Sequence, residues 1–144
     1  MGLKHRHSYE SLVQALKATE KHYLPTHTAG TLSAALVYPN LYSLGMSNLG
    51  YLTVHRILLT TPGTAVERFF PALEAERPLQ PPFYSFETGR PLGDFQIIMF
   101  SFSYEGDFDK IPGIFSALGI PVIAKARNRY HPILIAGGAA VASN

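Results

Sequence analysis

The chain contains no cysteine among its 144 residues. It therefore holds no disulfide, no thiolate metal site and no thiolate ligand for an iron–sulfur cluster. Its apolar runs all fall short of the roughly 20 residues that a membrane-spanning helix needs, and the N-terminus lacks the apolar core of a signal peptide. We therefore predict a cytoplasmic protein without a membrane partner. Chemistry that requires cysteine must belong to another polypeptide segment.

Charged residues are also few, at 15% of the chain, and the net charge is +2. This balance lacks the clustered positive charge of a nucleic-acid-binding surface, so we expect no nucleic acid partner. The six histidines include no HExxH motif, and the one HxH pair, His5 and His7, lies outside any predicted strand. The nucleotide motifs GxGxxG and GxxxxGK[ST] and the nucleophile motif GxSxG are absent as well. The sequence thus predicts no metal site and no catalytic triad.

What the chain does have is a series of short apolar runs that alternate with segments of helical periodicity. The runs predict strands at residues 32–38, 65–70, 95–100 and 133–136, with weaker ones at 83–86 and 120–124. The periodic segments predict helices at 8–22, 49–60, 72–77 and 111–118. This alternation predicts an α/β, flavodoxin-like (Rossmann-like) three-layer fold with a mostly parallel sheet.

The predicted fold has a leading helix and an incomplete end. Ser8 is the expected N-cap of the first helix, and residues 1–31 are predicted to form a helical extension to an α/β domain at 32–144. Asn144 follows the glycine pair Gly137-Gly138 by only six residues, so we expect the sheet to be truncated at its C-terminal end. An unpaired edge strand would then favour self-association of the isolated chain.

Ligands of open parallel sheets bind beyond the carboxyl ends of the strands, where the winding direction reverses. For a flavodoxin-like strand order this point lies between the first and third core strands. The segments 40–48 and 101–107 and the glycine pair at 137–138 should therefore converge on one crevice.

Three segments in a fixed order carry a family resemblance: YPNLYSLGMSNLG, YSFETGRPLGDFQIIMFSFSYE and HPILIAGG. Over roughly residues 32–143 the chain resembles the N-terminal cobalamin-binding-like domain of radical S-adenosylmethionine (SAM) proteins. The resemblance implies that SAM and a four-iron four-sulfur cluster are held by a downstream radical domain, which would be this domain's partner in the same chain. It also implies that the present chain is not catalytic by itself.

Cobalamin-binding domains of this type carry Asp-x-His-x-x-Gly in the first loop, Ser-x-Leu after the third strand and a later Gly-Gly. The positions that match these motifs, and the cofactor-binding residues that the resemblance implies, are Asn40, Tyr42, Gly45, Ser101, Ser103, Gly137 and Gly138. The histidine that would bind cobalt is replaced by Tyr42, and neutral tyrosine is a poor cobalt ligand. Any cobalamin held here should therefore be base-off and without a histidine ligand.

Structural interpretations of these residues stay open. Gly45 can serve a tight loop, Tyr42 can be a core aromatic, and serines often end strands by bonding to local backbone. The corresponding alternative function is a degenerate domain that binds no cofactor and acts as an interdomain or protein–protein interaction module.

Four charged residues lie nearest the expected crevice: Glu87, Arg90, Glu105 and Asp107. A carboxylate pair there could act as acid and base. The more ordinary interpretation is an ion pair between Arg90 and a neighbouring carboxylate, with Glu87 and Arg90 bracing the loop before the third core strand.

Overall fold

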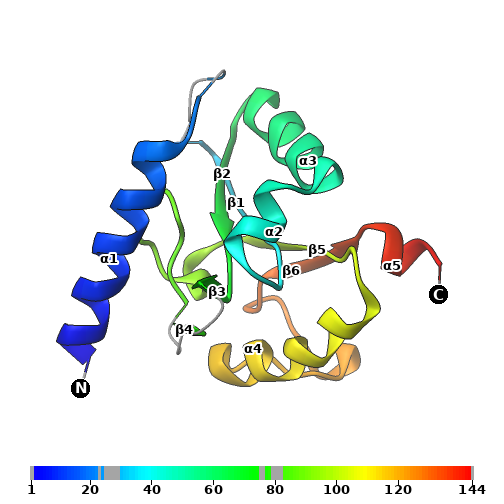
Figure 1. The fold of residues 1–144 in the computed structure, drawn as a ribbon. Coiled ribbons are helices and arrows are strands. Elements are labelled where there is room, and N and C mark those ends of the chain that lie inside the picture. The colour runs from blue at the N-terminus through cyan, green and yellow to red at the C-terminus, as the bar shows by residue number, and fades with distance from the viewer. Residues whose placement is uncertain (1, 23, 25–29, 75–76, 79–82, 144) are drawn as a thin grey trace.

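The computed structural model of the chain describes residues 2–22, 24, 30–74, 77–78 and 83–143. Its centre is a four-stranded sheet in the order β2-β1-β5-β6, in which every neighbouring pair is parallel (Figure 1). The strands are β1 (Leu32–Val37), β2 (Thr64–Phe69), β5 (Ile97–Ser101) and β6 (Ile133–Gly137). The predicted α/β fold with a parallel, flavodoxin-like sheet is confirmed.

Helices cover the two faces of this sheet. They are α1 (Gly2–Thr19), α2 (Tyr42–Met46), α3 (Leu49–Thr60), α4 (Ile111–Leu118) and α5 (Ala139–Ala142). Figure 1 shows α4 on the opposite side of the sheet from α3, with α1 beside β2 and β3. β2 is buried along its whole length and β1 at all but its first residue, as expected for continuous apolar strands between two helical layers.

Alternating side chains of the strands build one apolar core on each face. On the α4 face, Val37, Ile98 and Phe100 pack with Ile114 and Phe115, in what we call the α4 cluster. The α3 cluster, on the other face, contains Val13, Leu36, Tyr38, Tyr42, Tyr51, Val66, Phe70, Leu73 and Phe86. Val13 of α1 is therefore part of the core that the α/β domain shares with its leading helix.

Local signals explain where α3 and α4 begin and end. The Asn48 side chain accepts a hydrogen bond from the Tyr51 backbone N–H at 2.9 Å and so caps α3. Pro112 lies in the first turn of α4, where a missing N–H costs nothing. Gly119 ends α4 with φ 65°, a left-handed conformation that favours glycine.

Three local predictions are wrong. The leading helix runs over Gly2–Thr19, so Ser8 lies inside it and is not its N-cap. The described residues of the predicted helix at 72–77 are not helical: β3 (Ala72–Glu74) and β4 (Arg77–Pro78) pair antiparallel there, and residues 75–76 lie outside the described residues. Residues 120–124 form no strand, and the position beside β5 is taken by β6.

Two further predicted segments correspond to the structure only in part. The segment at 83–86 contributes an isolated bridge between Tyr84 and Pro91 and no full strand. The predicted connection at 78–82 lies outside the described residues apart from Pro78. In the described part of the chain, none of the helices has the length and apolar character needed to cross a membrane.

Candidate functional site

The three segments predicted to converge do meet at the carboxyl edge of the sheet. Between the loops after β1 and β5, the Asn48 side-chain amide donates to the Ser103 hydroxyl at 2.9 Å. The Phe102 backbone N–H donates to the Gly137 carbonyl at 2.8 Å, which joins the loop after β5 to the end of β6. Because β1 pairs with both β2 and β5, this edge is the point where the winding reverses.

The two glycines at the end of β6 have different roles. Gly138 has φ 113°, and a Cβ atom there would lie 2.2 Å from the Phe102 carbonyl oxygen. Only glycine allows this close approach of two backbone segments. Gly137 has no heavy atom within 4 Å of the position of a Cβ atom, so it borders open space.

Asp107 is the most buried charged residue of this edge, at 1% exposure. Its Oδ1 accepts hydrogen bonds from the Asn40 side-chain amide and from Lys110 Nζ, both at 2.7 Å. Among the described side chains, its Oδ2 is the buried polar atom that lacks a hydrogen-bond partner. A buried carboxylate oxygen without a donor is costly, so this position favours a hydrogen-bond donor from outside the described residues.

Tyr42 and Gly45 do not join this edge. The Tyr42 hydroxyl donates to Glu20 Oε1 at 2.7 Å, and its ring stacks on Phe86 within the α3 cluster. A Cβ atom on Gly45 would lie 2.7 Å from the Phe70 ring, so this glycine permits close helix packing. Tyr42 and Gly45 therefore pack within or against the α3 cluster. The structure places the other predicted cofactor-binding residues at the carboxyl edge: Asn40, Ser101, Ser103, Gly137 and Gly138.

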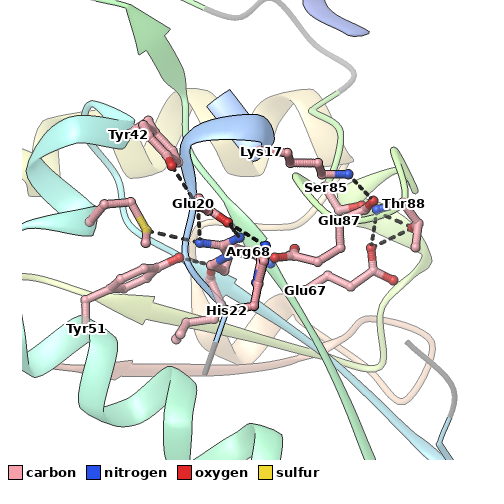
Figure 2. A network of polar contacts seen from close by, with 12 residues as sticks. Lys17, Glu20, His22, Tyr42, Tyr51, Glu67, Arg68, Ser85, Glu87 and Thr88 are labelled. Carbon is pink, nitrogen blue, oxygen red and sulfur yellow. Dashed lines mark hydrogen bonds and ion pairs between the residues drawn. The ribbon is translucent and has the colours of Figure 1, made fainter. Parts of the chain in front are cut away.

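A second polar cluster, centred on Arg68 in β2, was not predicted (Figure 2). Arg68 is 4% exposed and pairs with two carboxylates. Its guanidinium donates two hydrogen bonds to Glu20, both at 2.8 Å, and its Nε donates to Glu87 at 2.6 Å. Tyr42 donates to the same Glu20 carboxylate, and Lys17 Nζ donates to the Glu87 backbone carbonyl at 2.6 Å. We call these five residues the Arg68 network.

The Arg68 network fastens α1 and the segment around residue 87 to the sheet. Burial opposes the negative charge of Glu20, but hydrogen bonds from Arg68 and Tyr42 outweigh it and lower the pKa of the Glu20 carboxyl below its usual value. The Arg68 guanidinium also lies 4.7 Å from the centre of the Phe86 ring, a cation–π contact. The network is therefore a satisfied structural cluster, with each carboxylate held by a cation.

The sequence carried one signal for this network. Glu67 and Arg68 interrupt a strand that is otherwise apolar, and both are almost fully buried. Charged residues are rarely buried unless they are paired, so two of them in a core strand indicate a buried polar cluster. Glu67 has a separate partner, because its carboxylate accepts a hydrogen bond from the Thr88 hydroxyl at 2.6 Å.

Among the described residues, Arg90 has no ion pair with a carboxylate. The Arg90 guanidinium stacks 4.3 Å from the centre of the Phe95 ring and donates to the backbone carbonyl of Asp94. Glu87 pairs with Arg68 instead. Glu105 is exposed at the start of a short 3₁₀ helix, so Glu105 and the buried Asp107 are not presented together as an acid–base pair.

A cavity of about 580 Å³ lies between the end of α1, α3 and β2, directly beside the Arg68 network, since Glu20 and Arg68 both line it. His55 lines it, and burial together with the charge of Arg68 lowers the pKa of His55 to about 4. Within the described part of the chain, no group of three or more acidic, histidine or cysteine side chains is arranged to hold a metal ion.

Comparison with known proteins gives one match. Residues 50–144, more than half of the chain, match the family described as "Radical SAM proteins, N-terminal". No curated protein and no solved structure matches the chain. The matched region contains β2, β5, β6, α4 and the polar residues that follow β5 at the carboxyl edge. With its parallel α/β sheet, the chain belongs to the family of radical SAM proteins, N-terminal.

Proposed function

We propose that this chain is a non-catalytic N-terminal domain of a radical SAM protein and serves as an interdomain module. The observation that carries the proposal is the family match in a chain that has no cysteine. Reductive cleavage of SAM requires a four-iron cluster, and cysteine thiolates hold such clusters. That cluster and SAM would accordingly be bound by a downstream radical domain.

Two features of the structure support a role as a rigid module. The carboxyl edge is fastened across its loops by the contacts of Asn48 with Ser103 and of Phe102 with Gly137. On the other face, the Arg68 network ties α1 to β2. Preorganised surfaces lose little conformational entropy when a partner docks, which suits a domain that positions another one.

The test compares the chain with the full-length product of its gene. After reconstitution with iron and sulfide, we expect the full-length protein to bind a four-iron cluster and to form 5′-deoxyadenosine from SAM under reduction. Residues 1–144, treated identically, should retain no stoichiometric iron and form no 5′-deoxyadenosine. Cluster binding or SAM cleavage by residues 1–144 alone would refute the proposal.

Cobalamin binding is a second candidate function, and the convergence of three loops at the carboxyl edge favours it. Asn40, Ser103 and Gly137 lie there, and the open space beside Gly137 could admit part of a ligand. The residues present do not fit a corrin with a protein ligand to cobalt. Tyr42, which stands at the ligand position of the motif, is buried in the α3 cluster with its hydroxyl held by Glu20.

Gel filtration with hydroxocobalamin tests this candidate. If the domain binds it, the visible corrin bands should elute with the protein, and the cob(II)alamin form should show no nitrogen superhyperfine coupling from the protein. Gly137→Leu, which fills the open space at the carboxyl edge, should weaken binding. Gly113→Leu is the control, because Gly113 also has no heavy atom within 4 Å but lies in α4. Absence of corrin bands in the protein fraction would leave the interdomain module alone.

A further inference from the structure

The edge strand β6 differs from the other core strands because one of its faces is uncovered. Ile133 is 61% exposed and Ile135 is 41% exposed, and these alternate residues share one face of the sheet. Leu134, on the opposite face, packs against the α4 cluster. In register, Ile133 and Ile135 pair with Ile97 and Met99 of β5, and Met99 packs on the α3 cluster. The uncovered face is therefore the one that α3 covers farther along the sheet.

The backbone of β6 is unpaired on its outer side as well. The Ile133 N–H donates to the Gln96 carbonyl, and the Gly137 carbonyl accepts from Phe102, so these groups point toward β5. In a parallel sheet, successive residues of a strand direct their backbone groups alternately to its two neighbours. The N–H and C=O groups of Leu134 and Ala136 therefore point to the free edge, and among the described residues β6 pairs with β5 alone.

The path of the chain after β6 indicates what would cover this edge. The chain turns at Gly138 into α5, and α5 lies on the α4 face: Ala140 is 4% exposed within the α4 cluster, and its N–H donates to the Phe102 carbonyl. α4 itself connects β5 to β6 on that same face. Because crossovers between parallel strands are right-handed, a strand that follows a helix on this face lies on the far side of β6, parallel to it.

We propose that the free edge of β6 and its uncovered face, formed by Ile133 and Ile135, are the docking surface for the rest of the parent protein. The occupant is the segment that follows α5 in the same polypeptide: its strand pairs with Leu134 and Ala136, and its apolar side chains cover Ile133 and Ile135. This inference rests on the proposed function and deepens it, because it specifies which surface joins the module to the remainder of the protein.

A second copy of the chain is the physical alternative. Two β6 edges related by a twofold axis would pair antiparallel and bury the same isoleucines. Such pairing depends on protein concentration, whereas pairing with a strand of the same polypeptide does not. The two occupants can therefore be separated experimentally.

The experiment measures backbone amide exchange by NMR in residues 1–144 and in the full-length gene product. We expect the amides of Leu134 and Ala136 to exchange at least about 100-fold more slowly in the full-length protein, because they gain strand partners there. The amides of Ile133 and Ile135, which already point toward β5, should be protected in both proteins and serve as internal controls. This comparison needs no variant and is therefore independent of any folding defect.

A pair of matched variants tests the face. In the full-length protein, Ile133→Glu should lower the thermal midpoint, whereas Ile57→Glu on the outer side of α3 should change it little. Ile57 is 57% exposed in the described chain, close to the 61% of Ile133, so the two substitutions place the same charge at similarly exposed isoleucines. Equal effects of the two variants would contradict docking on the β6 face.

Each outcome bears on one proposal. Equal exchange of Leu134 and Ala136 in the two proteins, or a stop codon directly after Asn144, would overturn the docking surface. Protection of these amides that grows with the concentration of residues 1–144 and persists in a full-length dimer would assign the surface to a second copy. If the full-length protein binds the four-iron cluster but leaves the amides unprotected, only the docking surface fails. Protected amides in a full-length protein that binds no such cluster would instead refute the radical SAM function.

Discussion

Removal of the Arg68 guanidinium should destabilise the fold more than any other single charge deletion on β2. In Arg68→Met, the carboxylates of Glu20 and Glu87 lose the cation that donates three side-chain hydrogen bonds to them. Each of these carboxylates is only 8% exposed, so water cannot replace the lost donors without opening the structure. Breaking a buried ion pair by removing one partner costs about 3–5 kcal/mol. The free energy of unfolding of domains of this size is about 5–15 kcal/mol, so the predicted loss is a large fraction of the total stability.

Urea unfolding followed by far-ultraviolet circular dichroism at pH 7 measures this change. The control is Arg90→Met, because Arg90 stacks on Phe95 and donates to a backbone carbonyl, and it should cost no more than about 1 kcal/mol. The triple variant Arg68→Met, Glu20→Gln, Glu87→Gln should recover part of the loss, because neutral amides carry no unpaired charge. If Arg68→Met costs less than about 1 kcal/mol at an unchanged m-value, or the triple variant is less stable than Arg68→Met, the reasoning is refuted.

Three further predictions concern the site and its surroundings. Gly138→Ala should lower the free energy of unfolding in urea by at least about 2 kcal/mol, because φ at this position is 113° and the added Cβ atom would meet the Phe102 carbonyl oxygen. Gly137→Ala, beside open space, should change that free energy by no more than about 1 kcal/mol. Asn48→Ala should lower the free energy of unfolding by about 1 kcal/mol or more, because it removes the α3 cap and the contact with Ser103. Asn48→Ser keeps a capping oxygen and should retain most of that stability, so equal losses in the two variants would contradict the cap. The lowered pKa of His55 means that its contribution to stability is complete above about pH 6.5 and is lost as pH falls toward 4, because the unfolded chain binds that proton first. His55→Gln should therefore lose less stability between pH 7 and pH 4.5 than the unmodified chain, and identical pH profiles would show that His55 does not titrate differently on folding.

The strand framework and the location of the carboxyl edge follow from the sequence alone. The runs that became β1, β2, β5 and β6 are short, mostly apolar and bounded by loop-forming residues, which is the pattern of strands in a parallel sheet between helices. Once strands alternate with helices, the handedness of crossovers leaves few topologies, so the convergence of the loops after β1 and β5 could be predicted without coordinates. The lack of cysteine likewise excluded a cysteine-held cluster from this chain. Cobalamin binding, self-association and the domain boundary at residue 31 stay predictions.

Short segments and side-chain partners were decided by the tertiary structure. The segments at 72–77 and 120–124 are too short for periodicity to separate helix from strand, and in the described residues the first contains the strands β3 and β4 and the second contains no strand. The motif position of Tyr42 predicted that it would lie at the crevice. In the structure Tyr42 is the first residue of α2, and its ring packs in the α3 cluster with its hydroxyl bonded to Glu20. The Arg68 network joins residues that are 19 and 48 positions apart in the sequence. No local pattern encodes such a pairing, because it forms only when α1 and the segment around Glu87 pack against β2 and exclude the water that would otherwise solvate their charges.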